Sequence, residues 1–185
     1  MRRYSVPVTV DGVEMQAAPD TGSTGLRVLS WRLNGAPDPG SSVGYSYASG
    51  LRIEGRLVNV PVQLGVVSGN SPAQLVENLD CTPAHRNCPG EMLSKADYGL
   101  EGDGLKGQGF PAILGTNMAS NVARNPFIAV GFVRWIIELP RPGLRAPGRI
   151  ILDPTDEEIP AFVRLRSSLP YSRAVALFTM EYPVA

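Results

Sequence analysis

Hydrophobic and polar residues alternate in the first part of the chain with the period of two that is typical of half-buried strands. Residues 6–10 alternate valine with proline and threonine, and this pattern predicts a strand. Asp11-Gly12 is a strong hairpin signal. Residues 13–18 then predict a returning strand, and residues 26–29 predict a third. Asp20 therefore lies on a tight turn between two predicted strands.

The middle of the chain predicts a second hairpin followed by a helix and a long loop. Residues 45–64 read as the hairpin, because aliphatic residues alternate cleanly with polar ones in its second half. The run Ser71-Pro72-Ala73-Gln74 has an N-cap serine, proline at the first helical position and glutamine at N3. This signature predicts a short helix to about Leu79. Residues 80–109 predict a long polar loop, and loops of this length are usually functional or mobile.

The last third of the chain alternates between short apolar runs and turn residues. Residues 112–115 predict a short buried strand that ends in glycine. Residues 117–124 predict a helix of two turns, stopped by the next proline. Residues 135–139 and 149–152 predict two strands joined by a turn rich in proline and glycine. Residues 174–180 form an apolar run that predicts either a strand or a buried helix.

Composition supports an all-β fold in one domain that spans residues 1–185. The chain holds 20 glycines and 17 prolines between short strand-like runs, and 43% of its residues are hydrophobic. Its 17 basic and 17 acidic residues balance, so we expect no nucleic-acid partner. The most apolar stretch, residues 128–139, is interrupted by charges and too short to cross a bilayer. We therefore expect no membrane segment.

Two cysteines, Cys81 and Cys88, lie in the long polar loop with six residues between them. They predict a local disulfide, although two free thiols remain an alternative. A bonded pair would favour an oxidising compartment, periplasmic or secreted; the sequence otherwise leaves the localisation unknown. His85 is the only histidine, so we expect neither a metal site nor a cofactor.

Residues 20–24 read Asp-Thr-Gly-Ser-Thr and carry the best candidate chemistry. Three such common residues recur by chance, and Asp20 can equally cap its own backbone in an Asx-turn. Three later segments raise the significance of the motif. Residues 26–30, directly after the loop, read Leu-Arg-Val-Leu-Ser. Tyr47-Ala48-Ser49-Gly50 lies in the predicted second hairpin, and residues 110–115 read Phe-Pro-Ala-Ile-Leu-Gly.

These motifs, in this order, resemble those of the pepsin-like and retropepsin-like aspartic proteases. With the predicted closing hairpin, the resemblance covers most of residues 4–165, which corresponds to one lobe of a two-lobed pepsin. Retropepsins are single lobes that work as homodimers. The resemblance implies an all-β, closed β-barrel-like lobe with short helices, acting as a homodimer on peptide or protein substrates.

The resemblance also implies a role for each motif. Two Asp20 carboxyls would share one proton and activate a water molecule for attack on a peptide bond. Thr21 would lock the two loops together, Gly22 would allow close backbone approach, and Ser23 would hydrogen-bond the outer oxygen of Asp20. The remaining residues are a flap over the substrate and a strand that crosses behind the loop: Tyr47, Ala48, Ser49 and Gly50; Ile113, Leu114 and Gly115.

Several residues depart from the family pattern. Pro19 replaces the apolar residue before the aspartate, and Arg27 stands where pepsins carry a tryptophan that supports the flap tyrosine. These departures keep open a non-catalytic peptide-binding or structural protein with the same fold, and an unrelated β protein in which Asp20 only shapes a turn. An apolar cleft would prefer apolar residues, whereas Arg52 and Arg56 would favour acidic ones.

An acidic loop formed by Asp97, Glu101 and Asp103 is a weaker candidate for chemistry. Carboxylates at this spacing can bind Ca²⁺, but solvated loop charge is the more common reason for such a cluster. We therefore expect these three side chains to be solvated.

Overall fold

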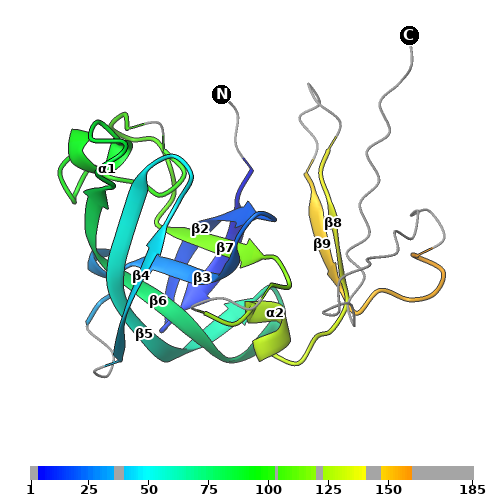
Figure 1. Ribbon diagram of the computed structural model, residues 1–185. Helices are drawn as coiled ribbons and strands as arrows, with labels where there is room; N and C mark the ends of the chain where they lie inside the picture. Colours follow the sequence, from blue (N-terminus) through cyan, green and yellow to red (C-terminus); the bar gives the residue numbers. More distant parts are fainter. Residues whose placement is uncertain (1–3, 36–39, 103, 120–122, 141–146, 160–185) are drawn as a thin grey trace, which may run out of the picture. The chain divides into compact units, whose positions relative to one another are not determined.

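A computed structural model describes residues 4–35, 40–102, 104–119, 123–140 and 147–159 (Figure 1). Strands make up 49% and helices 8% of the structure, so the all-β prediction is confirmed. The chain divides into two compact units, residues 1–130 and 131–185. We call them the barrel unit and the hairpin unit and describe each by itself.

Six strands of the barrel unit close into a barrel in the order β1, β2, β7, β3, β6 and β5, and the pairing of β5 with β1 completes the circle. A further strand, β4, pairs with residues 52–57 in the first half of β5. The predicted strands at residues 6–10, 13–18 and 26–29 are confirmed. The strand bounds are β1 Val6–Val10, β2 Val13–Asp20, β3 Thr24–Leu29, β4 Ser41–Ser46, β5 Leu51–Leu64, β6 Val67–Cys81 and β7 Ala112–Thr116.

The long strand β5 changes its buried face in its middle, close to a register shift in its pairing with β6. Leu51 and Ile53 are buried before the bulge, and the even-numbered residues from Val58 to Leu64 are buried after it. The register shift falls between Glu54 and Gly55. The extra residue at this shift is Glu77 of β6, which has no partner on β5. The two halves of β5 therefore serve two different parts of the core.

The predicted helix after Ser71 is wrong, because residues 67–81 form strand β6 instead. This strand pairs with β5 along its length and with β3 through residues 73–76. Ser71 is fully buried, as a ladder residue. The capping signature is a local preference of about 1 kcal/mol, and strand pairing on both sides outweighs it.

The predicted helix at residues 117–124 is also wrong within its described part, since residues 117–119 are not helical. A short helix, α2, occupies Pro126–Ala129 instead. Asn125 caps it, because its Oδ1 accepts hydrogen bonds from the backbone N–H groups of Phe127 and Ile128. Proline therefore begins this helix, as its fixed φ allows at the first position.

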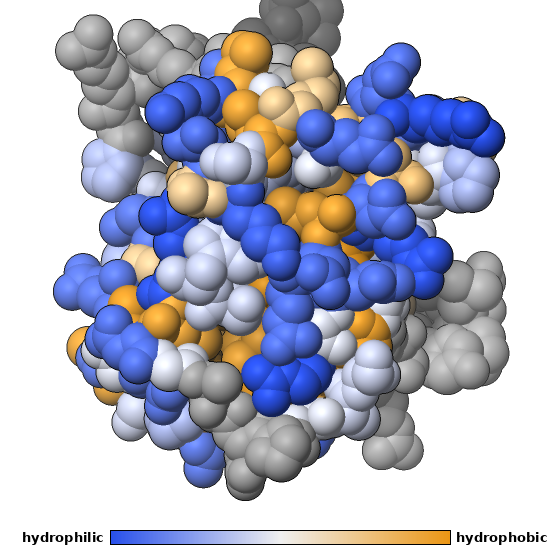
Figure 2. Space-filling model, turned by 90° about the vertical axis from the view of Figure 1, so that its left-hand side faces the viewer, coloured by the Kyte–Doolittle hydropathy of each residue, from blue (hydrophilic) through white to orange (hydrophobic). Residues whose placement is uncertain are grey.

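The predicted long loop at residues 80–109 has internal order. Helix α1 spans Pro89–Met92, and an isolated bridge joins Leu100 to Phe110 through two hydrogen bonds of 2.8 Å. Tyr98 and Leu100 are buried in the core. On the face shown in Figure 2, hydrophobic residues reach the surface in separate groups among hydrophilic ones.

The hairpin unit contains the predicted antiparallel pair of strands, β8 Trp135–Glu138 and β9 Arg149–Leu152. An ion pair between Glu138 and Arg149 joins their ends. The predicted element at residues 174–180 lies outside the described residues. Within the described ranges, no helix is long and apolar enough to cross a membrane.

Candidate functional site

Asp20 is the last residue of β2, where the strand enters the loop of residues 20–24, which we call the Asp20 loop. Its backbone pairs with Gly115 of β7. The backbone N–H of Gly22 donates to Asp20 Oδ1 at 2.8 Å, and Thr116 Oγ1 donates to the Asp20 carbonyl at 3.3 Å. The carboxylate is half-buried, whereas Thr21 and Gly22 are exposed. The loop thus presents a fixed carboxylate beside two accessible residues.

Strand β7 crosses behind the Asp20 loop between β2 and β3. Ile113 and Leu114 are buried. A side chain at Gly115 would meet the carbonyl oxygen of Gly25 at 2.7 Å and that of Ser23 at 2.8 Å. Only glycine fits there without a backbone shift. The motif of residues 113–115 therefore supports the loop from behind.

The Ser23 side chain is hydrogen-bonded to Arg27. It is buried, and its Oγ accepts a hydrogen bond from Arg27 Nη1 at 3.2 Å. The predicted hydrogen bond from Ser23 to the outer oxygen of Asp20 is absent from the part of the chain that the structure describes.

The turn between β4 and β5 contains residues 47–50, which we call the flap turn. The N–H of Tyr47 donates to the carbonyl of Leu51 at 2.8 Å, and that of Gly50 donates to the carbonyl of Tyr47 at 3.0 Å. Ala48 and Ser49 are exposed. Gly50 has a φ of +86° and is buried against the His85 side chain. The predicted hairpin is confirmed, and its turn is closely held.

Arg27 is a fully buried cation between the Asp20 loop and β4, which we call the flap strand because it leads into the flap turn. Its guanidinium carbon lies 4.1 Å from the centre of the Tyr45 ring and 5.9 Å from that of Tyr47. Its Nε and Nη2 atoms have no hydrogen-bond partner among the described residues. Gln74, its neighbour on β6, is also buried with its amide atoms unpaired. Burying a charge in this way is costly, which marks the position as unusual.

Tyr47 brings the flap turn and the Asp20 loop into one electrostatic environment. Its hydroxyl is buried and has no hydrogen-bond partner among the described residues. Burial is the main cause that raises the pKa of Tyr47; Arg27 lowers this pKa, and the carboxylates of Glu101 and Asp20 raise it further. These three charges therefore lie near the same phenol.

A cavity of about 230 Å³ opens beside Tyr47. Aliphatic and aromatic groups of Leu51, Tyr98 and Ile113 line it, together with Glu101. Burial, followed by the charge of Glu101, raises the pKa of Tyr98 to about 12. The hydroxyls of both tyrosines are therefore neutral at ordinary pH.

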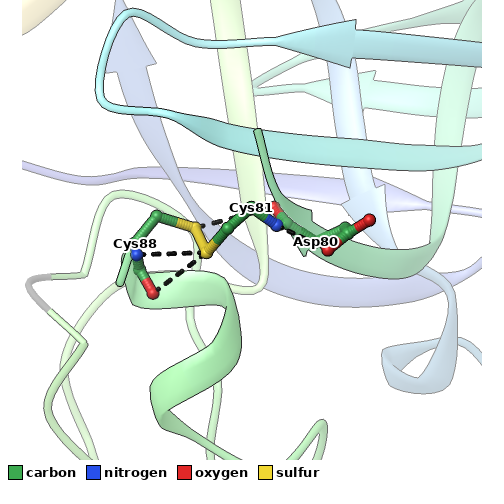
Figure 3. The surroundings of a disulfide bond; sticks show 3 residues. All are labelled: Asp80, Cys81 and Cys88. Carbon is green, nitrogen blue, oxygen red and sulfur yellow. Dashed lines mark hydrogen bonds between the residues drawn. A yellow bond between two sulfur atoms is a disulfide. The ribbon is translucent and has the colours of Figure 1, made fainter. Parts of the chain in front are cut away.

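Cys81 and Cys88 form the predicted disulfide, with an S–S distance of 2.05 Å (Figure 3). The bond connects the end of β6 to the residue before α1. The N–H of Thr82 within this loop donates to the carbonyl of Gly50 at 2.8 Å. The disulfide loop therefore supports the flap turn.

Sequence reasoning missed Tyr45 and Tyr98 of this site. The centres of the Tyr45 and Tyr47 rings lie 4.8 Å apart at the end of β4, and the spacing of the two residues by two positions was a usable signal. Tyr98 gave none, because it lies in an irregular loop. Glu101 was predicted to be solvated loop charge; its residue is exposed, and it also lines the cavity.

The two arginines expected to attract acidic substrates are neutralised. Arg52 pairs with Glu54 at 2.6 Å, and Arg56 pairs with Glu77 at 2.7 Å. Neither arginine lines the cavity. Among the described residues that line the cavity, the charged one is therefore Glu101. Among the described residues, no group of histidine, cysteine or acidic side chains is arranged to hold a metal ion.

No known protein family matches the chain, and no curated protein matches it in sequence.

Proposed function

We propose that the protein is an aspartic endopeptidase that acts as a homodimer. One observation carries this proposal: Arg27 joins the Asp20 loop to the flap turn, since it donates to Ser23 Oγ at 3.2 Å and its guanidinium carbon lies 5.9 Å from the centre of the Tyr47 ring. The charge of Asp20 is also among the causes that raise the pKa of Tyr47. A fixed carboxylate on a loop joined to such a hairpin suits peptide hydrolysis by water, because the carboxylate can act as a general base and the hairpin can close over the substrate.

The chemistry needs a second carboxylate, which a second copy of the chain would provide. Twofold dimers are the commonest oligomers, and a site on the axis receives the same residue from each chain. Thr21 and Gly22 are exposed next to Asp20, so they are available for contact with a partner loop. Of the two Asp20 carboxyls, one would be ionised and the other protonated.

In this mechanism, the ionised Asp20 takes a proton from water while the water oxygen bonds to the peptide carbonyl carbon. The protonated Asp20 hydrogen-bonds the carbonyl oxygen as negative charge develops on it. Protonation of the amide nitrogen then allows the C–N bond to break, which releases a carboxylic acid and an amine. The flap turn would exclude water from the site during these steps.

The disulfide also suggests where the protein acts. A bond between Cys81 and Cys88 persists in an oxidising environment. We therefore propose a periplasmic or secreted protease.

Asp20→Asn tests the proposal, with Asp11→Asn as the matched control. Asp11 is an exposed turn residue with a φ of +48°, a conformation that asparagine tolerates. Cleavage of a mixed peptide library at acidic pH is expected to fall by about a thousandfold or more in Asp20→Asn. It should be unchanged in Asp11→Asn and blocked by a statine-type analogue. Sedimentation should show a dimer.

A second candidate is a peptide-binding protein without catalysis. It is favoured by the hydrogen bond from Gly22 to Asp20 Oδ1, since an Asx-turn needs no further role for the carboxylate. This candidate predicts a single chain in solution that binds peptides and leaves them intact. Cleavage that survives Asp20→Asn would disprove the assignment of Asp20.

A further inference from the structure

We infer that the cavity beside Tyr47 is a subsite for a cationic side chain, lysine or arginine, of a bound peptide. The inference rests on the proposed function and adds the substrate class to it. The cavity measures about 230 Å³, below the roughly 300–1,000 Å³ of sites that enclose a drug-sized molecule. It has room for one side chain rather than for a separate ligand.

The walls of the cavity suit the stem of a long side chain. Leu51 and Ile113 are buried core residues that line it, and the rings of Tyr47 and Tyr98 complete the apolar part. Lysine and arginine bury their methylene stems against such surfaces and keep the charged end near polar groups. Aromatic rings also attract cations through their faces.

Glu101 gives the cavity its charge. Among the described residues that line the cavity, it is the single ionisable group other than the two tyrosines. It lines the cavity together with Tyr47 and Tyr98, and its negative charge raises the pKa of both phenols. The two neutral hydroxyls and the carboxylate together offer oxygen acceptors to an ammonium or guanidinium group.

This arrangement discriminates between classes of side chain. An apolar side chain in the cavity would remove water from the Glu101 carboxylate without forming a hydrogen bond to it, which is unfavourable. An acidic side chain would be repelled. A cation forms a charge-assisted hydrogen bond. Arg27 does not line the cavity, but its positive charge repels any cation near Tyr47. The measured preference for a cationic side chain is therefore smaller than the attraction of Glu101 alone would give.

The backbone holds Glu101 in place. The preceding residue, Leu100, forms the two-bond bridge with Phe110. Glu101 itself has a φ of +60°, a conformation that is unfavourable for a residue with a side chain. The bridge keeps the carboxylate at the cavity in spite of this cost.

The test uses matched peptides that carry lysine, norleucine or glutamate at each position around the scissile bond in turn. At one position the wild-type chain should prefer lysine over norleucine by about tenfold in kcat/KM, the size of one hydrogen bond to a charged group. Glu101→Gln should bring this ratio close to one, and Glu101→Arg should shift the preference to glutamate. Glu91→Gln is the control, because Glu91 is exposed and does not line the cavity.

Binding of the same labelled peptides to the Asp20→Asn chain separates this inference from the proposed function. A preference for lysine that needs Glu101, without cleavage by the wild type, would support the subsite and reject the protease. Cleavage that needs Asp20 but shows no preference for lysine would overturn the subsite alone. A preference for lysine that Glu101→Gln leaves unchanged would do the same. If the chain neither binds nor cleaves any of the peptides, both the subsite and the protease are rejected.

Discussion

The guanidinium of Arg27 lies over the ring of Tyr45 at 4.1 Å and donates to Ser23 Oγ at 3.2 Å. One buried side chain thereby joins the flap strand to the Asp20 loop. Arginine keeps its charge inside proteins, and its contact with an aromatic face contributes up to about 2 kcal/mol when water is excluded. The same burial costs free energy because two of its nitrogens are unpaired among the described residues.

Arg27→Met is expected to separate these two effects. Replacing a poorly paired buried charge by an apolar side chain is often neutral or stabilising by about 1–4 kcal/mol, so the free energy of unfolding should stay level or rise. The flap turn should nevertheless become looser, because the contact with Tyr45 is lost. Amide hydrogen exchange of residues 45–51 should accelerate several-fold in a chain whose denaturant midpoint has not fallen.

Arg32→Met is the control for this experiment, because Arg32 is exposed and follows the same strand. It should change neither the exchange of the flap turn nor the denaturant midpoint. Unchanged exchange of residues 45–51 in Arg27→Met would show that Arg27 does not hold the flap.

The disulfide is expected to stabilise both the whole fold and the flap turn. Cys81 and Cys88 are seven positions apart, and closing a loop of this size stabilises a protein by about 2–3 kcal/mol in the chain-entropy view. The double replacement of both cysteines by serine should lower the free energy of unfolding by about that amount. The Gly50 N–H donates to Tyr47 within the flap turn, and the Gly50 carbonyl accepts from the Thr82 N–H of the disulfide loop. Exchange of the Gly50 N–H should therefore rise as well, because the flap turn loses this support.

A reducing agent provides the matched comparison for the disulfide. It should loosen the flap turn of the wild-type chain and have no further effect on the serine variant. Equal protection of Gly50 in the oxidised wild type and the serine variant would show that the flap turn is held without the disulfide.

The first barrel strands were predictable because the alternation of hydrophobic and polar residues can be seen over a few neighbouring positions of the sequence. Residues 6–10 and 13–18 carry a period of two and an Asp-Gly turn, so neighbours along the chain determine their pairing. Ser71 shows the limit of such reasoning. Its capping signature is also local, but residues 67–81 are fixed by β5 on one side and β3 on the other, and these contacts are distant in sequence.

The candidate site was predictable where it lies on strands and unpredictable where it lies on the long loop. Asp20 and Tyr47 follow from motifs at the ends of predicted strands. Arg27 was noticed only as a departure, because nothing in the sequence states that a cation is fully buried. Glu101 is held at the cavity by the bridge between residues 100 and 110, and no hydrophobic periodicity in the sequence predicts this contact.

Tyr98 is expected to make stability fall at alkaline pH. Burial and the charge of Glu101 raise its pKa in the folded chain to about 12, against about 10 when unfolded. The folded chain therefore favours the neutral phenol. The contribution of Tyr98 to the free energy of unfolding is complete below the unfolded pKa, and roughly 2–3 kcal/mol of it is lost as the pH rises from about 10 to about 12.

Denaturant unfolding near pH 8 and near pH 11 measures this loss of the free energy of unfolding. The loss should be smaller for Tyr98→Phe than for wild type, whereas Tyr4→Phe, at an exposed residue, should leave it unchanged. Glu101→Gln removes the lesser cause, so phenolate absorbance should show the pKa of Tyr98 moving part of the way toward 10. A loss that Tyr98→Phe leaves intact would mean that the alkaline transition belongs to other groups.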